Sequence, residues 1–338
     1  MKVLVTGGAG FIGSALVRHL INNTSNHVVN VDKLTYAGCI DNLASCSLSD
    51  RYAFYRKDIC NKDELQDIFT KENPNAVIHL AAESHVDRSI QNPRAFLDTN
   101  VIGTYNLLEV TKQHLQQNNQ SDFRFIHVST DEVFGSLAET GLFSETSRYK
   151  PNSPYSASKA ASDHLVRAWH KTYDIPIITT NCSNNYGPYQ YPEKLIPLTI
   201  MHAIQGKPIP VYGNGLQVRD WLYVDDHVDG IMTVLGHGRV GETYNIGGFN
   251  EQTNISVVKT ICALLDTAIE DKPQGIKHFD QLIQHVTDRL GHDTRYAIDA
   301  TKMETELHWK PAETFQSGLD KTVQWYLNNL DWVKNKQF

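Results

Sequence analysis

The stretch that decides the fold is KVLVTGGAGFIG, residues 2–13. Its first part, Lys2–Thr6, has the aliphatic and β-branched composition of a buried strand. Gly7, Gly10 and Gly13 follow in a G-x-x-G-x-x-G spacing and open an amphipathic helical pattern. Glycines let the backbone approach a pyrophosphate, and a helix N-terminus offers it amides, so this turn predicts a dinucleotide site. The alternative is a glycine-rich turn that only packs a helix on a sheet.

Alternating strand and helix patterns continue through the first half of the chain, which is typical of βαβ units. Strands are expected at Lys2–Thr6, Val28–Val31, Ala53–Arg56, Ala76–Leu80, Phe123–Ser129 and Ile175–Cys182. Helices are expected at Ser14–Asn22, Lys62–Thr70 and about Pro93–Gln117. The pattern predicts an α/β fold: a Rossmann-type, doubly wound parallel sheet with a smaller, mixed α/β substrate-binding lobe.

Prolines and glycines become frequent after Cys182, as loops around a ligand pocket require. Trp221–Leu235 then has the pattern of a further strand and helix of the first lobe, and Glu242–Ile246 that of a short strand. We therefore expect residues 1–183 plus about 216–246 to form the dinucleotide-binding domain. Residues 184–215 and 247–338, approximately, would form the substrate lobe.

Composition excludes several classes of protein. The net charge is −7, and no basic run could follow a phosphate backbone, so a nucleic-acid partner is not expected. No apolar run approaches the roughly 18 residues of a membrane span. The five cysteines form no CxxC pair, and no H-E-x-x-H is present, so neither a disulfide framework nor a metal site is expected. A reducing, cytoplasmic location fits this cysteine usage.

The cofactor is predicted to be NAD. Asp32 ends the second strand, nineteen positions after Gly13, where a carboxylate binds the adenosine ribose and repels a 2′-phosphate. Asp58 and Ile59 follow the third strand beside the expected adenine, although Asp58 alone also suits a surface turn. The predicted cofactor set is Gly7, Gly10, Phe11, Ile12, Gly13, Asp32, Lys33, Leu34, Thr35, Asp58, Ile59, Leu80, Ala81, Ala82, Ser84, Thr99, Tyr155, Lys159 and Asn184.

Tyr155 and Lys159 lie four residues apart on a predicted helix, so a phenol and an ammonium share one face. A phenol with a pKa of about 10 is a poor base at neutral pH, and a fixed cation favours its phenolate. Thr130, at the end of the fifth strand, can hydrogen-bond the same substrate hydroxyl. These three residues predict proton removal from a hydroxyl group beside the cofactor.

Together these residues resemble the extended short-chain dehydrogenase/reductases of the NAD-dependent epimerase/dehydratase family, from Met1 to about Lys310. Within that family the chain is most similar to the dTDP-glucose 4,6-dehydratases. Phe134 departs from their pattern, which has tyrosine there. The matching strings are residues 6–13, 32–38, 81–89, 130–133, 181–189, 192–197, 219–224 and 289–293.

The resemblance implies a hydro-lyase in which two carboxyls, Asp131 and Glu132, divide the acid and base work. Bound NAD would oxidise C4 of dTDP-glucose with Tyr155 as base. Glu132 would remove the C5 proton, and protonated Asp131 would release the C6 hydroxyl as water. Hydride return to C6 would give dTDP-4-dehydro-6-deoxy-D-glucose, a precursor of rhamnose and other deoxysugars. The alternative is that the two acids only cap a following helix.

Cations in the second half of the chain suit a nucleotide diphosphate, namely Lys194, Arg219 and Arg289. The resemblance implies that Asn184 and Glu193 contact the sugar or its phosphates and that Tyr212 lies beside the base. An aromatic residue such as Tyr212 is more often part of core or surface packing. The predicted substrate set is Ser84, Thr130, Asn184, Glu193, Lys194, Leu195, Pro210, Tyr212, Arg219, Asn254, Arg289 and His292.

A homodimer is expected through the helical patterns at about Pro93–Gln117 and Tyr155–His170, as in relatives, unless these helices only cover the sheet. Rival functions within the same fold are a UDP-sugar 4-epimerase and a UDP-glucuronate decarboxylase. A rival of another class is an NAD-sensing protein without turnover. Asp131–Glu132 argues against the epimerase, and the intact Tyr155 and Lys159 argue against the sensor.

Overall fold

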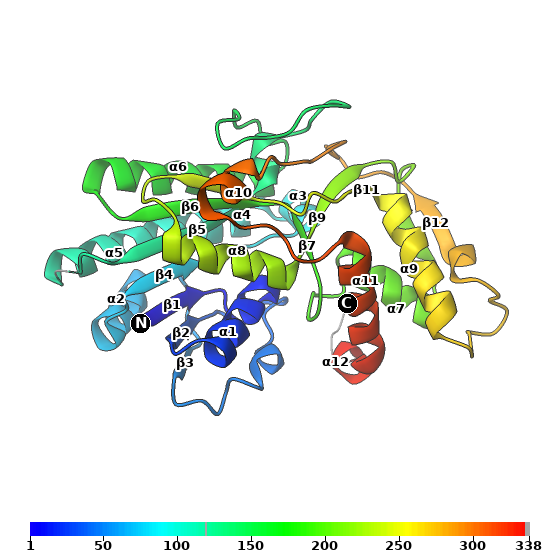
Figure 1. Cartoon of the computed structure of the whole chain (residues 1–338), viewed down its shortest axis with the longest axis horizontal. Coiled ribbons are helices and arrows are strands. Elements are labelled where there is room, and N and C mark those ends of the chain that lie inside the picture. The colour runs from blue at the N-terminus through cyan, green and yellow to red at the C-terminus, as the bar shows by residue number, and fades with distance from the viewer. Residues whose placement is uncertain (119, 335–338) are drawn as a thin grey trace.

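A seven-stranded parallel sheet forms the larger lobe in the computed structural model of the chain, which describes residues 1–118 and 120–334 (Figure 1). The predicted Rossmann-type fold is confirmed. In spatial order the strands are β10 (Thr243–Ile246), β6 (Ile177–Cys182), β5 (Arg124–Thr130), β4 (Ala76–His79), β1 (Lys2–Thr6), β2 (His27–Val31) and β3 (Tyr52–Tyr55).

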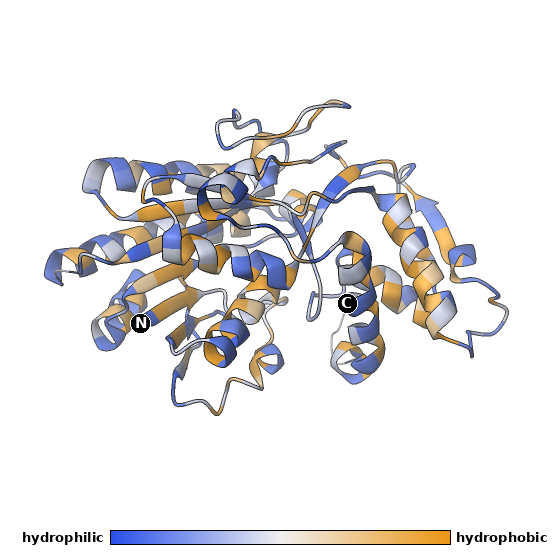
Figure 2. Ribbon diagram, in the orientation of Figure 1, coloured by the Kyte–Doolittle hydropathy of each residue, from blue (hydrophilic) through white to orange (hydrophobic). Residues whose placement is uncertain are grey.

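Helices cover both faces of this sheet because its strands are apolar on both sides. Val3 and Val5 of β1 pack into one buried cluster and Leu4 into another. The first face carries α1 (Phe11–Asn23), α8 (Val224–His237) and α10 (Thr301–Leu307). The second carries α2 (Lys62–Glu72), α5 (Thr104–Gln117) and α6 (Pro154–Tyr173). Figure 2 shows the strands as the most hydrophobic part of this lobe.

The helical pattern predicted over about Pro93–Gln117 is not one helix. It begins with α4 (Pro93–Phe96), preceded by α3 (Val86–Gln91), and continues as a π-helical segment, η2 (Leu97–Gly103), before α5. Asn100 in η2 is buried and donates to the Glu83 carbonyl and the Ser158 hydroxyl. A wider turn of this kind often occurs at functional sites.

The smaller lobe has its own hydrophobic core around Tyr186, Trp221 and Phe315. Its strands form two small sheets, β11 (Glu251–Thr253), β9 (Val218–Tyr223) and β7 (Asn184–Tyr186), and β12 (Ile283–Val286) with β8 (Ile209–Tyr212). Its helices are α7 (Leu195–Ile204), α9 (Asn254–Ala268), α11 (Phe315–Asn328) and α12 (Leu330–Lys334). Single 3-10 turns occur at η1 (Ile40–Leu43), η3 (Asp131–Phe134) and η4 (Phe279–Leu282).

Two segments differ from the predicted course of the chain. The strand expected at the start of Trp221–Leu235 is β9, which pairs with β7 and β11 and not with the large sheet. Only the helix of that stretch, α8, packs on the large sheet. Conversely Met303 and Trp309 pack into the first lobe's core. The domain boundaries given above stay a prediction, and their last four residues lie outside the described part of the chain.

Parallel strands bring their carboxyl ends to one edge of the sheet, and the loops there carry the predicted site residues. Gly7, Asp32, Leu80 and Asp131 all follow strands that end at this edge. In Figure 1 the chain enters β1 at the left, and the smaller lobe lies at the right, facing this edge. Among the helices within residues 1–118 and 120–334, none is both long and apolar enough to cross a membrane.

Candidate active site

The glycine-rich turn after β1 is packed too closely for side chains. A Cβ on Gly7, which has φ +74°, would lie 2.7 Å from the Ala81 backbone. A Cβ on Gly13 would lie 2.1 Å from the Gly7 carbonyl oxygen. Helix α1 begins directly after Gly10, and no side chain caps its first amides. The turn therefore leaves a bare helix N-terminus that can bind an anion.

Asp32 is held in place at the end of β2. Its carboxylate accepts hydrogen bonds from the amides of Ala9 and Leu34, each at 2.8 Å. Burial raises the pKa of Asp32, while both backbone hydrogen bonds lower it. Leu34 contributes only this amide, since its side chain packs against the core. The glycine-rich turn and the carboxylate thus form one rigid unit.

A single cavity contains the predicted cofactor residues except Leu34, which does not line it. Lys33 and Asp58 form an ion pair of 2.6 Å at its rim. Glu83, Gln190 and Tyr191 also line it and were not singled out from the sequence. The predicted residues on the wall are Gly7, Gly10, Phe11, Ile12, Gly13, Asp32, Lys33, Thr35, Asp58, Ile59, Leu80, Ala81, Ala82, Ser84, Thr99, Tyr155, Lys159 and Asn184.

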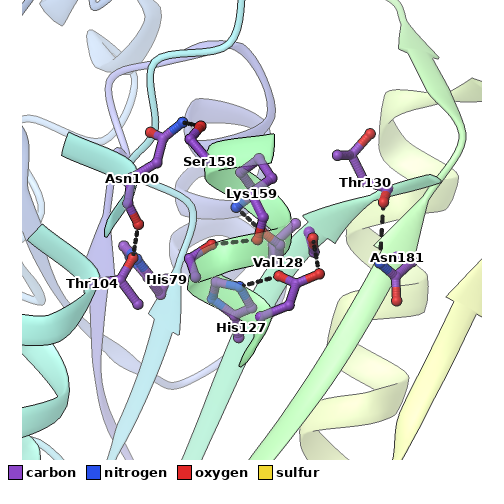
Figure 3. A network of polar contacts seen from close by, with 12 residues as sticks. His79, Asn100, Thr104, His127, Val128, Thr130, Ser158, Lys159 and Asn181 are labelled. Carbon is purple, nitrogen blue, oxygen red and sulfur yellow. Dashed lines mark hydrogen bonds and ion pairs between the residues drawn. The ribbon is translucent and has the colours of Figure 1, made fainter. Parts of the chain in front are cut away.

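Tyr155 and Lys159 reach this cavity from the first turns of α6, which Ser153 caps and Pro154 begins. Both side chains are buried, and Lys159 Nζ donates to the Val128 carbonyl at 2.9 Å (Figure 3). Burial lowers the pKa of Lys159. Burial, followed by the charge of Glu132, raises the pKa of Tyr155 well above its usual range. The phenol is therefore protonated until a cation or a reaction step favours its anion.

Asp131 and Glu132 begin η3 directly after β5 and line the same cavity. Thr130 caps this turn, because its hydroxyl accepts from the Glu132 amide at 3.3 Å. The structure therefore gives the capping role to Thr130 and not to the two acids. Asn181 donates to the Thr130 carbonyl at 3.1 Å and fixes the end of the strand (Figure 3).

The environments of the two acids differ. Burial, and then the charges of Glu132 and Asp220, raise the pKa of Asp131 well above its usual range. Asp131 Oδ2 is buried without a hydrogen-bond partner among the described residues. Glu132 is partly accessible, and burial raises its pKa overall, although the cations Arg219, Lys194 and Arg289 act in the opposite direction. One carboxyl is thus suited to donate a proton and its neighbour to accept one.

A second cavity lies between the lobes and shares Glu132 and Ser84 with the first. Except for Thr130, which lines the first cavity, the whole predicted substrate set lies on its wall. These residues are Ser84, Asn184, Glu193, Lys194, Leu195, Pro210, Tyr212, Arg219, Asn254, Arg289 and His292.

Neighbouring side chains orient the two arginines of the second cavity. Asp87 binds Arg289 through two hydrogen bonds of 2.6 and 2.8 Å. Arg219 lies 4.2 Å from the centre of the Tyr296 ring, and burial lowers the pKa of Lys194. Tyr296 also lines this cavity and was not predicted from the sequence. An isolated β-bridge between Val218 and Arg295 brings it to the site. No local pattern predicts such a distant pairing.

Within the described part of the chain, no group of three or more His, Cys, Asp or Glu side chains could hold a metal ion.

Comparison with known proteins places this site in a family. The model of the GDP-mannose 4,6 dehydratase family matches residues 4–322. The chain belongs to this family. As a member of the GDP-mannose 4,6 dehydratase family, it is 59% identical to a dTDP-glucose 4,6-dehydratase of Neisseria meningitidis serogroup B, over 99% of this chain and 95% of the relative.

Two solved structures resemble this GDP-mannose 4,6 dehydratase family member over the full length of both chains. The dTDP-glucose 4,6-dehydratase of Bacillus anthracis, solved in complex with NAD, is 46% identical with a TM-score of 0.88. The enzyme of the same name from Streptomyces venezuelae, also solved with NAD bound, is 43% identical with a TM-score of 0.91.

The first cavity fits NAD on the evidence of its own residues. Gly7 and Gly13 leave a cradle that a Cβ would fill, and the uncapped start of α1 faces it. Asp32 places an amide-bound carboxylate where the ribose hydroxyls of adenosine would lie. Tyr155 and Lys159 line the other end of the cavity.

Gly13→Ala is expected to weaken NAD binding by about tenfold or more, because the new methyl group would collide with the Gly7 carbonyl and displace the turn. The NAD content of the purified protein and a titration with added NAD measure this effect. Gly236→Ala is the control, since a Cβ there meets no atom within 4 Å. Equal NAD affinity of Gly13→Ala and Gly236→Ala would contradict the assigned binding mode.

Proposed function

We propose that this protein is an NAD-dependent dTDP-glucose 4,6-dehydratase, a hydro-lyase that forms dTDP-4-dehydro-6-deoxy-D-glucose. The observation that carries the proposal is the pair of neighbouring carboxyls, Asp131 and Glu132, with pKa values set differently by their surroundings. Elimination of water needs an acid and a base at adjacent carbons. The family relationship and the dTDP-glucose 4,6-dehydratases similar to this chain support the same reaction.

The first task of the chain is to remove the proton of the C4 hydroxyl. Tyr155 is the base, and Lys159, one turn further along α6, supplies the positive charge that favours its phenolate. The Thr130 hydroxyl, which also lines the cavity, orients the substrate hydroxyl. Bound NAD supplies the hydride acceptor for C4 and later the hydride donor for C6.

The second task is to eliminate water across C5 and C6. A ketone at C4 makes the C5 proton acidic, and Glu132 accepts that proton. Asp131 donates its proton to the C6 hydroxyl, which leaves as water, so the C5–H and C6–O bonds break together with formation of the C5–C6 double bond. Glu132 then returns a proton to C5 when C6 is reduced. The C4 hydroxyl proton stays on Tyr155 and Asp131 ends ionised, so transfer of one proton from Tyr155 to Asp131, directly or through water, closes the proton balance and resets the site.

The second cavity would bind the dTDP group. Lys194, Arg219 and Arg289 supply positive charge for the diphosphate, and Tyr212, partly exposed beside His292, offers an aromatic face to the base. Asn254, at the start of α9, and Pro210 flank that end of the cavity. Asn184 and Glu193 lie where the two cavities meet and would contact the hexose.

Arg289→Ala is expected to raise KM for dTDP-glucose by about 10- to 100-fold with a smaller change in kcat, because it removes a charge that binds substrate and transition state alike. Steady-state kinetics measure the split. Lys310→Ala is the control for net charge, since Lys310 pairs with Glu304 at the surface. A lowered kcat with unchanged KM would contradict a role for Arg289 in binding.

We also propose a cytoplasmic homodimer. Its contact would use apolar side chains exposed on η2, α5 and α6, namely Leu97, Ile102, Tyr105 and Tyr173. Leu97, Ile102 and Tyr105 lie within Pro93–Gln117, which was expected to pair with a second copy, and Tyr173 lies at the end of α6, just beyond the expected Tyr155–His170. In the described part of the chain the five cysteines form no disulfide, which suits a reducing compartment. Light scattering of the purified protein, and of an Ile102→Asp variant, tests the dimer.

The function itself is tested by incubating the purified protein separately with dTDP-glucose, UDP-glucose, GDP-mannose and UDP-glucuronate, and by analysing the products by mass spectrometry. Loss of one water from dTDP-glucose, faster than from the other sugars, is expected. An isomer of unchanged mass would indicate an epimerase, and loss of carbon dioxide from UDP-glucuronate a decarboxylase. NAD binding with no change in any sugar would indicate a sensor.

A further inference from the structure

A buried carboxylate, Asp163, lies one turn after Lys159 on α6, the helix that carries the proposed Tyr155–Lys159 pair. Tyr155, Lys159 and Asp163 follow at intervals of four residues, so they share the face of α6 that packs on β5. The Asp163 side chain is 3% exposed. It has no place in the reaction described above, and a buried charge needs a reason for its presence.

Three donors converge on this carboxylate. The Ser129 hydroxyl donates to Oδ2 at 2.8 Å and the Tyr149 hydroxyl at 2.9 Å, while His127 Nε2 donates to Oδ1 at 2.8 Å. Carboxylate oxygens accept all three bonds, whereas an amide in the same place would turn an NH2 group toward a donor. The three donors therefore suit an ionised carboxylate at Asp163 better than an amide.

The bonds of Asp163 and Lys159 reach adjacent residues of β5. Lys159 Nζ donates to the Val128 carbonyl (Figure 3). Asp163 accepts from the Ser129 hydroxyl, so both contacts lie just before Thr130. Thr130, Asp131 and Glu132 follow immediately. The position of the catalytic helix relative to the acid pair thus depends on these two contacts.

We propose that Asp163 is a positioning residue for the Tyr155–Lys159 pair: its carboxylate holds α6 on the end of β5, and its negative charge keeps Lys159 positively charged. This role rests on the proposed function, because it acts through the base that starts the reaction.

The other titratable side chains around Lys159 are neutral, so Asp163 is the neighbour whose charge can stabilise its ammonium. His127 on β5 and His79 on β4 are fully buried, and burial lowers the pKa of each, which keeps them neutral. Cys182 on β6 stays a thiol, since burial raises its pKa to about 12. Tyr155 on α6 is protonated at rest. Among these neighbours Asp163 is the carboxylate, and three donors bind its oxygens.

The direction of the effect follows from this arrangement. Burial lowers the pKa of Lys159, and the charge of Asp163 raises it. Without that charge Lys159 would lose its proton at a lower pH. Because the phenolate of Tyr155 needs the ammonium, activity would then fall earlier as the pH rises.

The test is the pH dependence of kcat for dTDP-glucose, measured with NAD-saturated wild type and variants. Asp163→Asn should move the alkaline limb to lower pH by about one unit or more. Asp163→Ser, which leaves room for water, should show the same shift, so the test survives if one variant fails to fold. Asp163→Glu keeps the charge and should restore the limb to its wild-type position even if kcat is lower. Circular dichroism and thermal melting show which variants are folded.

Tyr149→Phe separates charge from structural support, because it removes one donor and leaves the carboxylate. Its alkaline limb should match that of the wild type. An unshifted limb in a folded Asp163→Asn or Asp163→Ser would overturn the proposed role, as would an equal shift in Tyr149→Phe. A wild-type protein that leaves dTDP-glucose unchanged would instead overturn the proposed function, and this role with it.

Discussion

Tyr155→Phe should abolish formation of product from dTDP-glucose, with kcat lowered by about 10³-fold or more. The change removes one hydroxyl from a side chain that is 8% exposed and lines the cofactor cavity. Phenylalanine keeps the ring packing of Tyr155 against Phe96, so the fold should persist. Without the phenol no group at this position accepts the C4 hydroxyl proton, and every later step depends on that oxidation.

The control for Tyr155→Phe is its NAD content, which should equal that of the wild type. The variant should also show no absorbance of reduced nicotinamide when substrate is added, because the block precedes hydride transfer. Tyr55→Phe, a change on β3 outside both cavities, should leave kcat unaltered. Normal turnover by Tyr155→Phe would remove Tyr155 from the mechanism.

Glu132→Gln should stop the reaction one step later. The amide has the shape of the acid but does not accept the C5 proton, so kcat should fall by about 10²- to 10³-fold. C4 oxidation does not require Glu132, and the absorbance of reduced nicotinamide should therefore rise on mixing with dTDP-glucose and decay slowly. Stopped-flow absorbance and product analysis by mass spectrometry record both effects.

Asp131→Asn tests the same elimination step, because an amide does not donate a proton to the departing C6 hydroxyl. It should also accumulate reduced nicotinamide. Glu139→Gln, an exposed acid of the loop that follows, is the matched control and should behave as the wild type. Full-speed product formation by Glu132→Gln would contradict its role as the base.

Local patterns in the sequence predicted most of the large sheet. The run of β1 into Gly7–Gly13 and the four-residue spacing of Tyr155 and Lys159 are properties of single turns and strands. Boundaries of the strands moved by one or two residues, as at β2 and β3. Such features depend on neighbouring residues alone, and therefore can be read before the chain is folded.

Features that depend on distant pairing could not be predicted in this way. β9 has the composition of a core strand, yet its partners are β7 and β11, which makes it part of the smaller lobe. Leu34 does not line the first cavity, and its left-handed backbone turns its amide toward Asp32, so its contact with the cofactor stays a prediction. Asp163 gave no signal in the sequence, because a lone acid on a helix is usually exposed.

The most direct test of the central claim is a reaction of the purified protein with dTDP-glucose deuterated at C4, without added NAD. We predict loss of water with the deuterium found at C6 of the product by NMR and mass spectrometry, because hydride leaves C4 and returns to C6 within one active site. A dehydrated product without deuterium at C6, or a C4 epimer formed without loss of water, would contradict the proposed hydride transfer from C4 to C6.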